Sequence, residues 1–304
     1  MFLGLDTSNY TTSAAAFDGK TAKNAGRLLP VRPGELGLRQ SDAVFAHIKQ
    51  LPQMVEQLFD GLDRNEIQAV AASTRPRAVE GSYMPCFLVG ESFGRCLAQT
   101  LDVPFYSVSH QQGHIAAAAW SAGRMDLLDS PHLAWHLSGG TTELLLVQPD
   151  VKNVIAQKIG GTTDISAGQV IDRTGVLLDA AFPAGKALDA LAAESGKRDL
   201  FRVKLQDLSF SFSGLENKVQ AYQNAGNSRE DTAAYCIRSV ADLIFRATVA
   251  AQKQYPDLPV IFSGGVSSNK MLRELCSPLN PIFAAPEYST DNALGVAVLC
   301  SRQE

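Results

Sequence analysis

Two histidines four residues apart, His110 and His114, are the residues of this chain best placed to do chemistry. If residues 111–119 form a helix, the two imidazoles lie one turn apart on one face, close enough to bind a single metal ion. Asp291, near the end of the chain, supplies a carboxylate as a third ligand. Such a set leaves coordination positions open, as a working metal site requires. The sequence therefore predicts a metal centre; the alternative is a helix with two hydrogen-bonded core histidines.

His132 and His136 have the same spacing and provide an internal comparison. They lie between Pro131 and a Gly-Gly turn, in an apolar run that predicts a strand. Four residues of strand span about 13 Å, so this second pair cannot share an ion. Helical context, rather than spacing, is what favours a metal site at the first pair.

Two glycine-rich turns at the ends of predicted strands suit a nucleotide phosphate. Without Cβ atoms their backbone N–H groups can approach an anion, and neighbouring hydroxyl groups donate further hydrogen bonds. The second turn also leads into a helix from Lys270, whose N-terminus favours an anion or a ribose. The alternative is a pair of ordinary tight turns. The predicted nucleotide contacts are Ser138, Gly139, Gly140, Thr141, Gly264 and Gly265.

A third polar segment lies between these turns, at residues 160–173. On a helix, Gln169 and Asp172 share one face, and a carboxylate in that position suits ribose hydroxyls. The alternative is a solvated helix face. The Phe-Pro-Ala-Gly run that ends at Gly185 then predicts a turn that closes over a base.

The elements that must position these residues alternate between strands and helices. A strand–turn–strand unit at residues 3–17 is echoed at residues 135–147, which predicts a duplicated α/β architecture with two lobes. The longest helix begins with a capping-box-like pair, Ser228 and Asp231, and stops before Pro256. The expected helices cover residues 43–61, 90–101, 109–120, 167–178, 231–255 and 291–301.

Composition limits the class of protein. The chain has 304 residues, of which 45% are hydrophobic and 19% charged, and its formal charge is −4. This mild acidity offers no electrostatic footprint for nucleic acid, so a nucleic-acid substrate would need a local basic patch or a partner subunit. The chain shows no secretory signal and no apolar run of membrane-spanning length. Five cysteines without a Cys-x-x-Cys pair indicate reduced thiols and a cytoplasmic location.

Six motifs occur in one order along nearly the whole chain. Together they resemble the threonylcarbamoyl-transferase family, the tRNA threonylcarbamoyladenosine synthase component formerly called O-sialoglycoprotein endopeptidase or glycoprotease. The motifs are Ser-His-x-x-x-His-Ile, Leu-Ser-Gly-Gly-Thr-Thr-x-Leu, Asp-x-x-Ala-Gly-x-x-x-Asp-Arg, Phe-Ser-Phe-Ser-Gly-Leu, Ser-Gly-Gly-Val-Ser-Ser-Asn and Ser-Thr-Asp-Asn-Ala.

The resemblance implies the bilobal, duplicated actin-like ATPase fold shared by acetate kinase, sugar kinases, Hsp70 and actin. We expect an N-terminal lobe at residues 1–115, on which a C-terminal helix at residues 292–304 packs. A C-terminal lobe at residues 116–291 follows, with nucleotide and metal expected in the cleft between the lobes.

The resemblance also implies an activity: metal-dependent transfer of a threonylcarbamoyl group from threonylcarbamoyl-adenylate to a tRNA adenosine, a carbamoyl-type acyl transfer. It assigns iron or zinc to His110, His114 and Asp291, with Mg²⁺ and ATP as a further option. It implies three partners: a smaller paralogous subunit, an ATPase or kinase-like component and an enzyme that supplies the adenylate. The tRNA would be reached through partner subunits. A homodimer is an alternative assembly. The implied adenylate-binding residues are Ser138, Gly139, Gly140, Asp172, Gly185 and Asn269.

The chain departs from the family pattern at four places, which suggests a divergent paralogue. Asn9-Tyr10 occupies the place of an acidic pair after the first Thr-Ser, and Gln169 that of a glutamate. Glu216-Asn217 is found where the family has Lys-Thr, and residues 74–83 replace a Pro-Gly-Leu stretch. One alternative function is therefore a carbamoyltransferase acting on a small molecule or a protein, with Arg75 and Arg77 as anion contacts. Another is a non-catalytic scaffolding paralogue.

Overall fold

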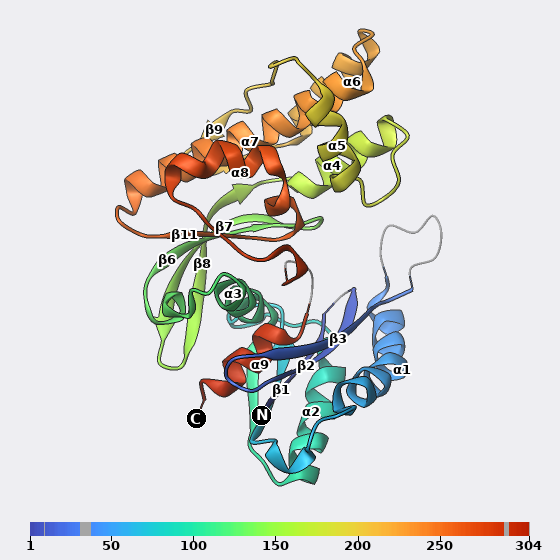
Figure 1. The fold of residues 1–304 in the computed structure, drawn as a ribbon, viewed down its shortest axis with the longest axis vertical. Coiled ribbons are helices and arrows are strands. Elements are labelled where there is room, and N and C mark those ends of the chain that lie inside the picture. Colours follow the sequence, from blue (N-terminus) through green and yellow to red (C-terminus); the bar gives the residue numbers. More distant parts are fainter. Residues whose placement is uncertain (9, 31–37, 289–291, 304) are drawn as a thin grey trace. The chain divides into compact units, whose positions relative to one another are not determined.

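The computed structural model describes residues 1–304 except 9, 31–37, 289–291 and 304 (Figure 1). Contacts divide the chain into two compact units: the first contains residues 1–130, 148–156 and 287–304, and the second contains residues 131–147 and 157–286. Compared with the lobes expected from the sequence, the first unit extends past residue 115 to residue 130. It also takes in the tip of a hairpin, at residues 148–156.

The first unit is built on a five-stranded sheet in the order β3-β2-β1-β4-β5. β2 is antiparallel to both β1 and β3, whereas β4 runs parallel to β1 and β5 parallel to β4. The strands are β1 (Phe2–Thr7), β2 (Thr11–Phe17), β3 (Ala22–Leu28), β4 (Ala69–Arg75) and β5 (Phe105–Ser109). The helices are α1 (Gln40–Phe59), η1 (Arg64–Glu66), α2 (Phe87–Leu101), α3 (His110–Ser121), η2 (Met125–Asp129) and α9 (Leu294–Ser301).

The central strand β1 separates the helices of the first unit into two layers. Leu3 and Leu5 join one apolar cluster with residues of α1 and α2. Gly4, between them, faces α9, where an added Cβ would come within 2.4 Å of the Ala297 nitrogen. Since successive strand residues point to opposite faces, α1 and α2 cover one face of the sheet and α9 the other.

Helix α3 packs directly against α9 through a pair of glycines (Figure 1). A Cβ added to Gly295 would lie 1.7 Å from the Gly113 carbonyl oxygen, so only hydrogen fits at this crossing. The sheet therefore supports α9, and α9 in turn supports the helix that carries His110 and His114.

The second unit is built on a seven-stranded sheet in the order β12-β11-β6-β7-β8-β10-β9. Helices α4 to α8 lie together on one side of this sheet (Figure 1) and share one large apolar cluster with it. The strands are β6 (His132–Leu137), β7 (Thr142–Asp150), β8 (Asn153–Thr162), β9 (Leu205–Gln206), β10 (Ser209–Phe210), β11 (Val260–Ser263) and β12 (Ile282–Phe283). The helices are α4 (Ala167–Leu177), α5 (Gly185–Glu194), α6 (Ser213–Asn224), α7 (Arg229–Gln254), η3 (Gly265–Ser268), α8 (Lys270–Cys276) and η4 (Ser277–Leu279). The short η5 (Pro286–Tyr288) crosses the boundary, since residues 287 and 288 belong to the first unit.

The two sheets repeat one topology. In the second sheet, β6 is antiparallel to β7 and parallel to β11, and β11 is parallel to β12. The run β8-β7-β6-β11-β12 therefore has the same order as β3-β2-β1-β4-β5. This repetition confirms the duplicated α/β architecture predicted from the two hairpins.

None of the helices in the described part of the chain combines the length and the hydrophobicity that crossing a bilayer requires.

Candidate active site

The start of α3 is fixed by a reciprocal cap. The Ser109 hydroxyl accepts a hydrogen bond from the Gln112 backbone N–H (3.3 Å), and the Gln112 side-chain oxygen accepts one from the Ser109 N–H (2.8 Å). This capping box makes His110 the first helical residue and places His114 one turn later on the same face. The predicted helix at residues 109–120 is confirmed.

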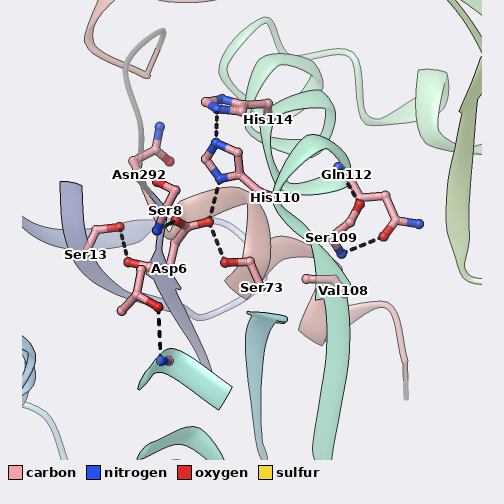
Figure 2. Close-up of polar contacts among 12 residues, drawn as sticks. Asp6, Ser8, Ser13, Ser73, Val108, Ser109, His110, Gln112, His114 and Asn292 are labelled. Carbon is pink, nitrogen blue, oxygen red and sulfur yellow. Dashed lines mark hydrogen bonds and ion pairs between the residues drawn. The ribbon is translucent and has the colours of Figure 1, made fainter. Parts of the chain in front are cut away.

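The two imidazole rings point their Nε2 atoms at each other, as Figure 2 shows. The Nε2 atoms of His110 and His114 lie 2.9 Å apart, with ring centroids at 4.3 Å and planes inclined by 75°. The second histidine pair lies on β6, where His132 is fully buried, so the expected strand at that pair is confirmed as well.

Asp6, at the end of β1, lies behind His110. Its Oδ2 atom is 2.8 Å from the His110 Nδ1 atom and accepts a hydrogen bond from the Ser73 hydroxyl (2.7 Å), while Oδ1 accepts one from the Ser8 N–H (2.9 Å). The carboxylate is 1% exposed. An ionised carboxylate at this position holds the proton of His110 on Nδ1 and leaves the Nε2 lone pair directed at His114. Asp6 was not among the site residues predicted from the sequence.

Two imidazoles on one helix face are donors of a type that suits a divalent metal. In a tetrahedral zinc site, two Zn–N bonds of about 2.0–2.1 Å place their nitrogens about 3.3 Å apart, whereas the two Nε2 atoms share a hydrogen bond of 2.9 Å, close to that separation. A carboxylate on the far nitrogen of a ligating histidine is the usual second partner in such sites. Asp291, the third predicted ligand, lies outside the described residues. Among those that are described, no group of three His, Cys, Asp or Glu side chains converges on one point.

The first glycine-rich turn, in the second unit, is fixed to the start of α4. The Ser138 N–H donates to the Thr141 carbonyl (2.8 Å), and the Ser138 hydroxyl accepts from the Thr141 N–H (3.0 Å). The Ser166 hydroxyl donates to the Gly139 carbonyl (2.6 Å). A Cβ added to Gly168 would lie 2.5 Å from the Gly139 Cα, so α4 and the turn are in direct backbone contact.

The second glycine-rich turn lies at the same sheet edge, because Ser263 of β11 pairs in register with His136 of β6. Gly264 has φ +88°, and a Cβ there would meet the Leu137 carbonyl oxygen at 2.2 Å, so this position requires glycine. The turn opens η3 rather than the helix from Lys270 directly.

Asn269, Asp172 and Gly185 meet around the N-terminus of α5. Asp172 on α4 accepts a hydrogen bond from the Ala184 N–H (2.9 Å), the residue before Gly185. The Asn269 amide donates to Asp189 of α5 (2.9 Å), and its oxygen caps α8. Desolvation of the half-buried Asp172 carboxylate raises its pKa, and this effect exceeds the lowering by the hydrogen bond from the Ala184 N–H. Asp189 was not predicted from the sequence either.

Four of the predicted nucleotide contacts are glycines that border open space. A Cβ added to any one of them would meet no atom within 4 Å, in contrast to the crowded positions 168 and 264. These backbones can approach a phosphate or a ribose closely. The open positions are Gly139, Gly140, Gly185 and Gly265.

The model of one protein family, described as tRNA N6-adenosine threonylcarbamoyltransferase, matches residues 37–298 of this chain. The chain belongs to this family. Among its relatives, the tRNA N6-adenosine threonylcarbamoyltransferase of Prochlorococcus marinus (strain MIT 9303) is 34% identical over 83% of this chain and 75% of its own. The enzyme of the same name from Rhizobium leguminosarum bv. trifolii (strain WSM2304) is 32% identical over 97% of this chain and 86% of its own. The resemblance identified from six motifs is confirmed.

The fold of this threonylcarbamoyltransferase-family chain is also found in a solved structure. The activator of the 2-hydroxyisocaproyl-CoA dehydratase from Clostridium difficile, with bound ADPNP, matches 100% of this chain and 95% of its own with a TM-score of 0.57. At 15% identity this likeness concerns the fold alone. Together with the repeated sheet topology, it confirms the bilobal actin-like ATPase fold.

Two of the departures from the family pattern have a structural explanation. Gln169 closes a capping box with Ser166: its side-chain oxygen accepts a hydrogen bond from the Ser166 N–H (3.0 Å). Glutamine serves in a capping box as well as glutamate does. Glu216 forms an ion pair with Arg173 (2.8 Å). Asn9, the first residue in place of the acidic pair, lies outside the described residues.

Proposed function

We propose that this chain transfers a threonylcarbamoyl group from threonylcarbamoyl-adenylate to an adenosine of tRNA next to the anticodon, with a divalent metal bound by His110 and His114. The observation that carries this proposal is the 2.9 Å approach of the two Nε2 atoms, with Asp6 hydrogen-bonded to the opposite side of His110. Family membership supplies the reaction and the substrates. Asp291 completes the proposed ligand set.

Iron and zinc both suit two imidazoles and a carboxylate. A metal bound there supplies Lewis-acid stabilisation of negative charge on the carbonyl oxygen of the threonylcarbamoyl group. The protein's contribution is orientation: the Asp6 carboxylate keeps the His110 Nδ1 protonated and fixes the ring, and Ser73 fixes Asp6. The capping box of α3 then sets the position of His114 relative to His110.

The adenylate is assigned to the glycine-rich turns of the second unit. Backbone N–H groups at Gly139, Gly140 and Gly265 suit phosphate oxygens because no Cβ blocks their approach. Asp172 and Asn269 suit the ribose hydroxyls. In the reaction, the exocyclic amine of the acceptor adenosine forms a bond to the carbamoyl carbon, the bond from that carbon to the phosphate oxygen breaks, and the amine nitrogen loses a proton as AMP leaves.

We propose that tRNA reaches this chain together with a smaller paralogous subunit and an ATPase or kinase-like component, with a separate enzyme supplying the adenylate. The reaction would take place in the cytoplasm, where tRNA is found and where thiols stay reduced. All five cysteines are free, in agreement with that assignment.

The test is a parallel measurement of bound metal and of transfer to unmodified tRNA, with partner subunits and threonylcarbamoyl-adenylate supplied. We expect His110→Ala to lose bound iron or zinc and to lower transfer by at least about a hundredfold, because a ligand and its oriented charge are both removed. His136→Asn, which removes an imidazole from β6, is the matched control for metal content. Full metal occupancy in His110→Ala, or no transfer by the metal-loaded wild type, would contradict the proposal.

A further inference from the structure

The chain has a net charge of −4, yet it contains short basic segments, one of them in the second unit. Residues 197–204 read Lys-Arg-Asp-Leu-Phe-Arg-Val-Lys, which is four cations and one anion, or +3. Subtracting +3 from −4 leaves −7 for the rest of the chain. Residues 20–27 carry the same net charge of +3, but there two of the three cations already have partners, because Lys23 donates to the Asp60 carbonyl and Arg27 to the Gln53 side chain.

The basic segment at residues 197–204 is fixed to the body of the second unit although it forms neither helix nor strand. The Phe201 N–H donates to the Ser239 hydroxyl of α7 (2.8 Å), and Arg246 of α7 donates to the Val203 carbonyl (2.8 Å). The side chain of Val203 is buried in the apolar cluster of this unit. The segment then continues into β9, the outermost strand of the sheet (Figure 1).

Exposure alternates along the fixed part of the segment. Phe201 and Val203 are turned towards the core, whereas Arg202 and Lys204 are exposed. This period of two is that of an extended chain, in which next-but-one side chains lie on the same side about 6.6 Å apart. The two cations therefore project together from the outer side of an anchored backbone.

The acidic neighbours of the segment already have partners. Asp231 forms an ion pair with Lys197 (2.9 Å), and Asp199 accepts a hydrogen bond from the Tyr222 hydroxyl (2.9 Å). Among the residues that the structure describes, no carboxylate lies within ion-pair distance of Arg198, Arg202 or Lys204. A fourth cation joins them from α6, where the Lys218 ammonium lies 5.9 Å from the centroid of the Phe201 ring.

We propose that Arg198, Arg202, Lys204 and Lys218, here called the basic strip, contact the phosphate backbone of the tRNA acceptor. Arginine and lysine side chains are the usual partners of nucleic-acid phosphates, and contacts to the backbone fix the position of the nucleic acid without reading its sequence. The inference rests on the proposed function, which makes tRNA the substrate. An acidic protein surface is the other class of partner that such a strip would suit.

The test compares two variants that each remove two exposed lysine or arginine charges from the full chain. Arg202→Ala with Lys204→Ala alters the basic strip, and Lys20→Ala with Lys253→Ala is the control with the same net charge. Binding of an unmodified tRNA transcript to the chain with its partner subunits is measured by fluorescence anisotropy at several salt concentrations. With about 0.7 counterion released per phosphate contact, losing two contacts weakens binding roughly 25-fold at 0.1 M salt. The slope of log K against log salt becomes shallower by about 1.4.

We expect the control variant to bind tRNA like the wild type. The inference is overturned if the two variants bind equally well, if the salt slope does not change, or if the wild-type chain together with its partner subunits does not bind tRNA. The strip would then be assigned to an acidic protein partner. Transfer activity of the wild type with its partner subunits is measured on the same preparation. Transfer without any effect of the strip substitutions would refute the strip alone, whereas absence of transfer would refute the proposed function.

Discussion

Asp6 is the residue that the sequence could not reveal as part of the site. Its partners, Ser73 and His110, lie 67 and 104 positions away in the chain, so no local pattern connects them. Only the adjacent ends of β1, β4 and β5 bring the three together. Asp6 is a positioning residue in the proposed site, because it contacts His110 and not the metal position.

We therefore expect Asp6→Asn to weaken metal binding about tenfold to a hundredfold while both histidines remain, because the carboxylate that orients His110 is lost. Affinity is measured by competition with a chromophoric chelator for Zn²⁺. Asp60→Asn, at an exposed carboxylate just after α1, is the matched control and should leave the affinity unchanged. Equal affinities for wild type and Asp6→Asn would remove Asp6 from the site.

His47 is a second buried group of the first unit, on α1. It is 0% exposed, and its Nδ1 atom lies 2.8 Å from the Thr12 hydroxyl, which itself donates to Gln50. His47 therefore donates from Nδ1, and within the described part of the chain its Nε2 atom makes no hydrogen bond. Burial lowers the pKa of His47 from its ordinary value of 6.5, more than the Ser8 backbone and the Asp6 charge raise it.

The folded protein thus keeps His47 neutral, whereas the unfolded chain protonates it as the pH falls through 6.5. Unfolding takes up a proton there, so the stability that this difference contributes is present above pH 6.5 and is lost on acidification. We expect His47→Gln to flatten the decline in free energy of unfolding between pH 7 and pH 5. Denaturant titrations in a His110→Ala, His114→Ala background measure this without the other two imidazoles of the site. Parallel pH profiles with and without His47 would show that it carries no such effect.

At the level of elements, most of the fold could be predicted because caps and periodicity are local signals. The cap of α7 at Ser228, the strand at β6 and the two hairpins all follow the sequence pattern. Helices α5 and α6 were not predicted, because Gly185 and Gly214 at their first turns resemble loop residues and neither helix has a side-chain cap. Their helical state depends on packing against α7 and α4, which is tertiary information.

The crossing of α3 and α9 is the contact on which the proposed metal site depends most. Gly295→Ala would bring a Cβ to 1.7 Å from the Gly113 carbonyl oxygen, so the helices must separate. We expect a loss of about 3 kcal/mol in the free energy of unfolding, which is the upper end of the usual cost of overpacking a core. The better helix propensity of alanine offsets only part of this cost. Gly214→Ala, also in a helix but with no atom within 4 Å of the new Cβ, should cost nothing. Equal stability of the two variants in urea would contradict this view of the crossing.

For the whole molecule, the two units hold different parts of the proposed chemistry. The candidate metal ligands His110 and His114 belong to the first unit, and the glycine-rich turns at residues 138–141 and 264–265 to the second. A ligand stabilises the state that binds it, by about 2.7 kcal/mol at a hundred times its dissociation constant. Each ligand should therefore protect its own unit against local opening.

We expect hydrogen exchange followed by mass spectrometry to separate the two effects. Zn²⁺ should slow exchange in peptides from residues 105–121, and ADPNP should slow exchange in peptides from residues 138–142 and 263–272, because each set contains the proposed contacts. His110→Ala should lose the zinc effect and keep the nucleotide effect, and this dissociation is the internal control. Protection of the glycine-rich turns by zinc alone, or of the start of α3 by nucleotide alone, would reverse the assignment of the two ligands to the two units.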